Sequence, residues 1–303
     1  MAEKNTHIID PEGDLILFHI MDGEEHRIRV STKHLTRASP FFARVCVGRE
    51  QESTEPSCSR GCLPDFDGLK LESVLILMRI IHGQASVLPE AIEFPTLVDL
   101  AVLADRCQCA PLARYFALQW VDNLPTATEG PSEYGKEVME WIYVAWVWNL
   151  SKEFEANTLV AVETSSEMVH SHDLPLPGMV IERIKRNREK AIAKALARLK
   201  RAERKFLDGA GECCYRFSSI MLGYLQRNLY NAGIKDPVWP KAPYVGESYQ
   251  RLVEEVESFV NPGDEDGDSD DERYDLQRFL NVRNVAVGLK LENFTHSSYV
   301  NSE

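Results

Sequence analysis

Hydrophobic and polar positions alternate over residues 15–20 and again over 27–30, which is the period-two pattern of β-strands. In the first strand both alternating sets are largely apolar, so we expect one face in a core and the other face covered as well. The Asp22-Gly23 pair between the strands predicts a tight hairpin, because Gly tolerates the positive φ that such turns require. Residues 31–42 then read as a helix, which the Ser31 or Thr32 side chain could cap.

Two further helical patterns follow before residue 124. Apolar residues recur at one-turn spacing and predict a single helix face at Leu71, Val74, Leu75, Met78 and Ile81. Gly83 then supplies a left-handed cap. A third run, interrupted at Cys107-Gln108-Cys109, carries apolar positions at Leu97, Leu100, Ala101, Ala104, Leu112, Tyr115, Phe116 and Trp120.

The helical pattern ends at Leu124, and the composition of residues 125–131 predicts a linker or long turn. Residues 138–148 are apolar at helical spacing on every face and include three tryptophans, which predicts a helix buried all round. Residues 179–207 then predict a long amphipathic helix. Its apolar stripe consists of Ile181, Ile184, Ile192, Leu199 and Phe206.

Basic residues fall on the opposite side of this long helix, at Arg183, Arg186, Lys190, Lys194, Arg201 and Arg204. Such a face could hold nucleic acid, an anionic membrane or an acidic partner, and residues 183–188 could act as a nuclear import signal. The alternative, which we favour, is that the apolar stripe packs on the tryptophan helix and the basic face is simply solvated.

The order of strands, turn and helices resembles that of a BTB/POZ domain. The amino-acid sequences of residues 78–83 and 100–107 are similar to those of the BTB proteins of filamentous fungi. The resemblance implies an α+β fold over residues 10–124, a small sheet with helical hairpins, followed by a mostly α-helical C-terminal region over 133–257. The core and interaction signature that it implies consists of Asp14, Leu35, Ser39, Phe42, His82 and Ala104.

A BTB/POZ domain binds other proteins, and by this resemblance a cullin scaffold of a ubiquitin ligase is one expected partner. The expected surface lies where the helices meet the outer strand and the loop over 50–65. A homodimer is possible, but the sequence argues against it. Ser31 and Thr32 stand where dimeric BTB domains carry basic residues opposite the acid that Asp14 would supply, and only thirteen residues precede Asp14.

Composition agrees with an intracellular interaction protein of the cytoplasm or the nucleus. The 303 residues suffice for about two domains. A formal net charge of −13 argues against general nucleic-acid binding, because neutralising phosphates requires a basic surface, although a local basic patch could still exist. No run approaches the roughly 20 apolar residues that cross a bilayer, and the first residues lack the pattern of a secretory signal.

Candidate chemistry is sparse. The seven cysteines suit a reducing compartment, and neither Cys58 with Cys62 nor Cys107 with Cys109 has a second pair at zinc-site spacing, although His170 and His172 could join one after folding. No nucleophile elbow, phosphate loop or zinc-protease motif is present. We therefore expect no catalytic residues, no cofactor and no metal, and a function in protein binding. The alternative is a nuclear, transcription-associated regulator that contacts nucleic acid or chromatin through the basic helix.

An acidic run follows the helical region. Residues 264–272 hold seven carboxylates, and their mutual repulsion predicts a disordered linker over 261–275, ahead of a C-terminal tail over 276–303. The spacing does not fit a calcium loop. Ser269 resembles the target of an acid-directed kinase, and its phosphorylation would tighten a contact between this run and the basic helix.

Overall fold

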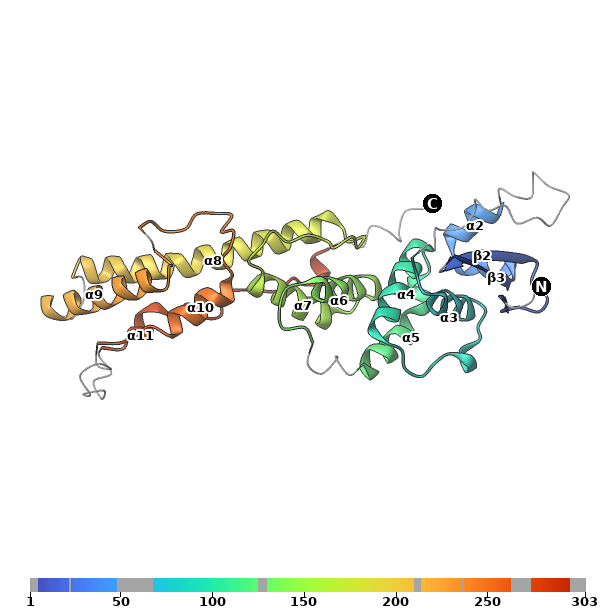
Figure 1. Ribbon diagram of the computed structural model, residues 1–303, viewed down its shortest axis with the longest axis horizontal. Helices are drawn as coiled ribbons and strands as arrows, with labels where there is room; N and C mark the ends of the chain where they lie inside the picture. Colours follow the sequence, from blue (N-terminus) through green and yellow to red (C-terminus); the bar gives the residue numbers. More distant parts are fainter. Residues whose placement is uncertain are drawn as a thin grey trace. The chain divides into compact units, whose positions relative to one another are not determined.

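The computed structural model describes residues 5–21, 23–47, 68–124, 130–209, 214–235, 237–262 and 274–294. The chain folds into two compact units. The N-terminal unit comprises Met1–Gly130, Glu140–Glu153 and Leu291–Glu303, and the C-terminal unit comprises Pro131–Met139 and Phe154–Lys290. The fold is mixed α+β, with many helices and one small sheet (Figure 1).

The sheet lies in the N-terminal unit and has the strand order β1-β3-β2. Its strands are β1 (Thr6–Ile8), β2 (Leu15–Met21) and β3 (Glu24–Val30). Strands β2 and β3 form the predicted antiparallel hairpin, with Gly23 at φ 79° in its turn. The parallel pairing of β1 with β3 was not predicted, since three residues are too few to show a period.

Helices complete the N-terminal unit: α1 (Thr32–Ala38), α2 (Pro40–Val47), α3 (Leu71–Ile81), the 3₁₀ helix η1 (Ala85–Val87), α4 (Phe94–Arg106) and α5 (Ala110–Asn123). Helix α3 packs against α1, α4 and α5. It confirms the predicted helix, and Gly83 has the left-handed φ of 70°. Its burial is wider than one face, because Ile76, Leu77 and Ile80 are buried and Leu75 only in part.

In helix α5, part of the face that the sequence predicted to be buried is exposed. Its buried positions are small residues with Trp120 and Val121, whereas Leu112 and Tyr115 are exposed. The Trp120 indole donates a 2.9 Å hydrogen bond to the carbonyl of Pro89. Small residues therefore bring α5 close to its neighbours.

The tryptophan helix is α6 (Lys136–Trp148), and residues 140–148 belong to the N-terminal unit. Trp141 stacks on Phe94 with ring centroids 4.6 Å apart, and the Tyr143 hydroxyl donates to Asp105 at 3.2 Å. The near-complete burial predicted for this helix is confirmed, with Trp146 and Val147 half-buried. Its tryptophans are core residues of the first unit.

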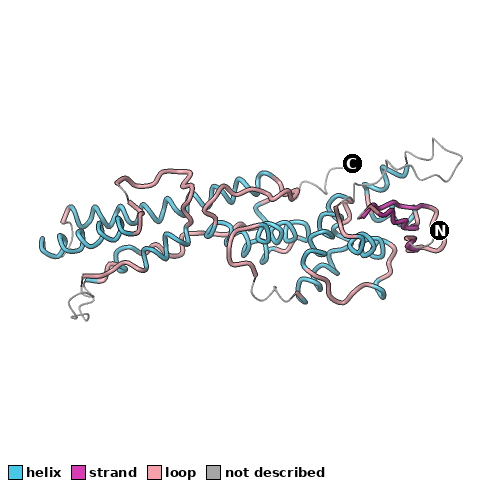
Figure 2. The backbone as a smooth tube through the Cα atoms, in the orientation of Figure 1, coloured by secondary structure: helices cyan, strands magenta, loops and turns pink. Residues whose placement is uncertain are grey.

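The C-terminal unit is helical. Its elements are most of α7 (Ser151–Thr164), then α8 (Gly178–Leu207), α9 (Tyr215–Asn231), α10 (Tyr249–Glu257) and α11 (Gln277–Leu280), and η4 (Leu291–Asn293) follows in the N-terminal unit. Helix α8 packs against α9, α10 and α11, and α9 runs beside it in the tube view (Figure 2).

The apolar stripe predicted for α8 is buried at every position. Its neighbours are α9, α10 and α11. Residues 276–294, predicted as a tail, are packed and bury seven apolar side chains: Leu276, Leu280, Val282, Val285, Leu289, Leu291 and Phe294. Most of the predicted acidic linker, including Ser269, lies outside the described residues.

Candidate interaction surfaces

The first surface is the outer face of the three-stranded sheet. Leu15, Leu17 and His19 of β2 point inward and are buried. The alternating residues point the other way and, with their partners on β1 and β3, form what we call the outer sheet face: Ile8, Ile16, Phe18, Ile20, Glu25, Arg27 and Arg29. The sequence predicted that this face would be covered. It is not, since Ile8, Ile16 and Ile20 are 61%, 38% and 52% exposed.

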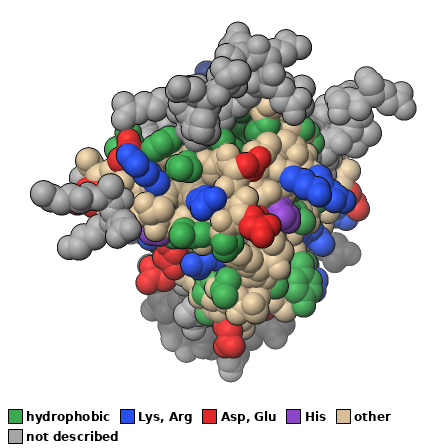
Figure 3. Space-filling view, turned by 90° about the vertical axis from the view of Figure 1, so that its right-hand side faces the viewer, with side chains coloured by type: hydrophobic (Ala, Val, Ile, Leu, Met, Phe, Trp, Pro, Cys, Tyr) green, Lys and Arg blue, Asp and Glu red, His purple; other side chains and the backbone are tan. Residues whose placement is uncertain are grey.

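The two arginines occupy the central strand of this face, with apolar residues on the strands to either side. Arg29 pairs with Ile16 across the β2–β3 ladder and with Ile8 across the β1–β3 ladder. The Arg27 guanidinium lies 5.8 Å from the centre of the Phe18 ring. Figure 3 is turned so that the side of Figure 1 that shows the sheet faces the viewer, and there hydrophobic side chains lie in small groups between charged ones.

A hollow of about 590 Å³ opens where the hairpin meets the beginning of α3. Its lining consists of Met21, Glu24, His26, Lys70, Leu71 and Glu72. This is the place where the sequence predicted that helices and strand would form an interaction surface. The loop over 50–65 that belongs to the same prediction lies outside the described residues.

The six predicted signature residues belong to the interior and its caps. Leu35, Phe42 and Ala104 are fully buried. Ser39 accepts a 3.0 Å hydrogen bond from the amide of Phe42 at the start of α2 and donates to the carbonyl of Cys107. Leu35, Ser39, Phe42 and Ala104 therefore belong to the core of the N-terminal unit.

Asp14 and His82 fix the beginning of α1. Asp14 accepts a 2.7 Å hydrogen bond from the amide of Thr32, so an aspartate from the strand region supplies the cap predicted for Ser31 or Thr32. His82 Nε2 accepts a 2.9 Å bond from the amide of Ser31, while His82 Nδ1 donates to the carbonyl of Met78 at 2.7 Å. Burial lowers the pKa of His82, although its bond to Met78 opposes the shift, and the neutral ring is the form that can accept.

Asp10, His34 and His82 bring one possible metal-ligand atom each within 4.8 Å of one another. Both ring nitrogens of His82 are already engaged in the bonds to Ser31 and Met78. A cation here would have to break one of them. Among the described residues no other group of three His, Cys, Asp or Glu has ligand spacing, and Cys58 and Cys62 lie outside those residues.

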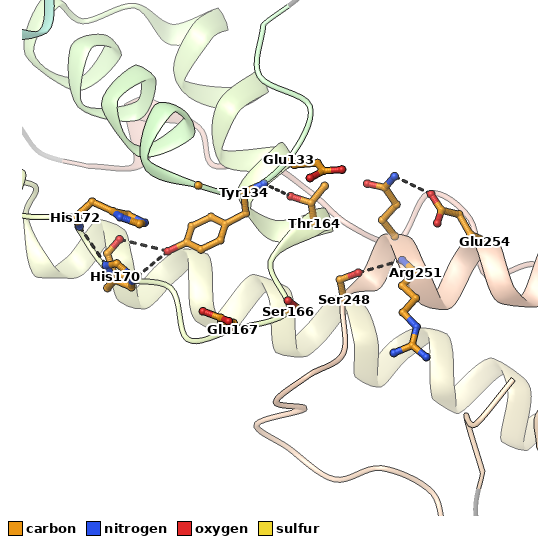
Figure 4. Close-up of a pocket in the computed structure, with 12 residues that line it drawn as sticks. Glu133, Tyr134, Thr164, Ser166, Glu167, His170, His172, Ser248, Arg251 and Glu254 are labelled. Carbon is orange, nitrogen blue, oxygen red and sulfur yellow. Dashed lines mark hydrogen bonds between the residues drawn. The ribbon is translucent and has the colours of Figure 1, made fainter. Parts of the chain in front are cut away.

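A polar pocket of about 470 Å³ lies in the C-terminal unit (Figure 4). Carboxylates of Glu133, Glu167 and Glu254 line it together with Arg251. Tyr134 crosses its floor, where the hydroxyl accepts a 3.0 Å bond from the amide of His170. Burial raises the pKa of Tyr134.

Two hydroxyls of this pocket have structural partners. Ser248 accepts a 3.1 Å bond from the amide of Arg251 as the cap of α10. Thr164 accepts a 2.7 Å bond from the amide of Tyr134 and donates to the carbonyl of Val160 at 2.8 Å. Both hydroxyls are held as caps and tethers, so neither is placed as an activated nucleophile. The lining suits a polar or cationic group.

Helix α8 carries the predicted basic residues. All six of them, Arg183, Arg186, Lys190, Lys194, Arg201 and Arg204, are exposed, and we call this set the basic stripe. Arg188, which belongs to the candidate import signal over 183–188, lies within the apolar stripe and is 4% exposed, so it is not part of an exposed basic signal. A cation at an apolar position was the signal that could have found it, because a buried charge requires partners.

Comparison with known proteins adds no relative. No family model, no curated protein and no solved structure matches this chain. Among the described residues no helix is both long and apolar enough to cross a membrane.

Proposed function

We propose that this protein is a non-enzymatic protein-interaction module whose outer sheet face docks a partner protein. The observation that carries the proposal is the exposure of three isoleucines, Ile8, Ile16 and Ile20, on a sheet whose other face is buried. Protein interfaces combine apolar anchors with arginines, and this face offers both within a few ladder positions.

The charges of this face define the partner's chemistry. Arg27 and Arg29 lie on the central strand, between apolar residues of β1 and β2. Their guanidinium groups also make local bonds, to Glu25 at 3.3 Å and to the carbonyl of Gly13 at 2.8 Å, which hold them in place. A complementary partner presents apolar side chains on either side of carboxylates.

By its resemblance to BTB/POZ domains, the chain would use this unit to hold a cullin scaffold and its helical unit to select a second protein. The element order supports this proposal, because a hairpin, two short helices, a further helix and an α4–α5 pair follow one another as the resemblance implies.

Quantitative affinity purification from the native cell tests the proposal with three whole-chain baits. The first is the unaltered protein, and the second carries Ile16→Glu with Ile20→Glu. The third is a matched control with Val87→Glu and Leu112→Glu, which adds the same charge at exposed apolar positions of the same unit. We expect cullin recovery with the first and third baits and at least a tenfold loss with the second. Equal recovery with all three would refute the assignment of the face.

A further inference from the structure

The eleven Lys and Arg residues of α8 divide into two sets in the structure. Five have partners within the fold: Lys185 pairs with Glu182, Arg188 and Arg198 donate to carbonyls, and Lys200 and Lys205 lie over aromatic rings. The other six are the basic stripe. Among the described residues, no ion pair, hydrogen bond or cation–π contact is found for them. The fold therefore does not account for their charge.

The basic stripe is long and continuous. At 100° per residue its six members fall within an arc of roughly 80°. From Arg183 to Arg204 the stripe extends about 32 Å along the helix axis, at 1.5 Å per residue. Between residues 178 and 207 the helix carries three acidic residues against eleven basic ones. Of those three, Glu182 and Glu203 are already paired with Lys185 and Lys235.

The stripe also lacks a hydrophobic anchor, which decides the kind of ligand. A protein partner usually contributes binding energy through buried aromatic or aliphatic side chains, and the stripe offers only Ala197 between its cations. Charge alone is sufficient for a nucleic-acid backbone, where neutralised phosphates release counterions. The length of about 32 Å also approaches one turn of a DNA duplex, roughly 34–36 Å.

We propose that the basic stripe of α8 binds the phosphate backbone of duplex nucleic acid without reading its sequence. The stripe offers only cationic side chains with Ala197 between them, and contacts of cations to phosphates position a protein on the duplex without carrying sequence information. The basic stripe shares no residue with the outer sheet face. A negative result for this proposal therefore leaves the function proposed above unaffected, and the reverse also holds.

Fluorescence anisotropy with a labelled 24-base-pair DNA duplex tests the inference on the whole chain. The stripe variant carries Arg186→Gln, Lys190→Gln and Lys194→Gln. The matched control carries Arg216→Gln, Arg227→Gln and Lys241→Gln, which removes three exposed charges from the same unit. With six phosphate contacts, log Kd is expected to change with log salt at a slope of about 5. The stripe variant is expected to lose about 2.7 of that slope, and the control none of it.

Three results would overturn the inference: no duplex binding at 50 mM salt even when the acidic run over 264–272 is neutralised, equal weakening in the control, or tighter binding of poly-glutamate than of duplex. The last would assign the surface to an acidic protein. The chain's own carboxylates at 264–272 could compete with the duplex, so a second sample replaces all seven by their amides or by Ser. Failure of that sample to bind refutes the proposal outright.

Discussion

Arg188 is the side chain whose loss should damage the C-terminal unit most. It lies in the apolar stripe of α8 and donates to five backbone carbonyls, those of Ser165, Ser166, Pro243, Tyr244 and Glu247, at 2.6–3.3 Å. A guanidinium remains charged even though burial lowers the pKa of Arg188. One side chain therefore ties the segments at 165–166 and 243–247 to the long helix.

The cost of removing it follows from those bonds. Arg188→Met keeps most of the apolar stem but leaves five carbonyls without their charged donor. A hydrogen bond to a charged group contributes about 1.5–3 kcal/mol, and a buried unsatisfied group costs about 1–3 kcal/mol. Because some of the freed carbonyls will reach water, we expect a loss of about 3–5 kcal/mol. Arg188→Lys should lose about half as much, since three donors on one nitrogen cannot span this set.

Urea unfolding monitored by circular dichroism measures the loss, with Arg201→Met on the exposed stripe as the matched control. The control is expected to change the free energy of unfolding by less than about 0.5 kcal/mol. Hydrogen exchange adds a local readout, because the amide of Gly246 donates to the carbonyl of Ser166 at 2.9 Å and should lose protection. A loss below about 1 kcal/mol in Arg188→Met, with that amide still protected, would refute the reasoning.

Three further predictions concern individual contacts. The folded-state pKa of His82 is lowered, so the neutral ring's contribution to stability is complete above its ordinary pKa of 6.5 and is lost as pH falls through the lower folded value. Unfolding measured from pH 7.5 to 5 should therefore show a shallower pH slope in His82→Gln, and an unchanged slope would contradict this. Ser39→Ala should cost about 2–3 kcal/mol in thermal unfolding, since a buried amide and a buried carbonyl both lose their partner, whereas Ser39→Thr, which keeps the hydroxyl, should cost less. Gly288→Ala should cost about 1–3 kcal/mol, because a Cβ there would lie 2.3 Å from the carbonyl oxygen of Glu155; a variant as stable as the parent would show that the backbone moves aside.

Local patterns predicted much of the fold because their causes are local. The hairpin turn at Gly23, the helix over 71–81 and the amphipathic helix ending at Leu207 each follow from residues close in the chain. The resemblance to BTB/POZ domains stays a prediction, since no family model, curated protein or solved structure matches the chain. What the structure supports is the coarser statement of an α+β fold with a small sheet.

The remaining features depend on interactions between distant residues. The cap of α1 comes from Asp14, eighteen positions before Thr32, whereas the sequence pattern pointed only to the local side chains of Ser31 and Thr32. The outer sheet face was expected to be covered because its alternation is apolar, and alternation alone does not say which segment would cover it. Arg188 was missed because the helix was read for two faces, while its five acceptors come from loops elsewhere in the unit.

The most direct test of the central claim is calorimetric titration of the whole chain with a purified cullin scaffold. We predict saturable binding that weakens at least tenfold in the double variant Ile16→Glu, Ile20→Glu, since each isoleucine loses about 1 kcal/mol of burial and adds a charge that must be desolvated. The Val87→Glu, Leu112→Glu control should bind as the parent does. Parent-like affinity in the Ile16→Glu, Ile20→Glu variant, or no heat of binding with the unaltered chain, would contradict it.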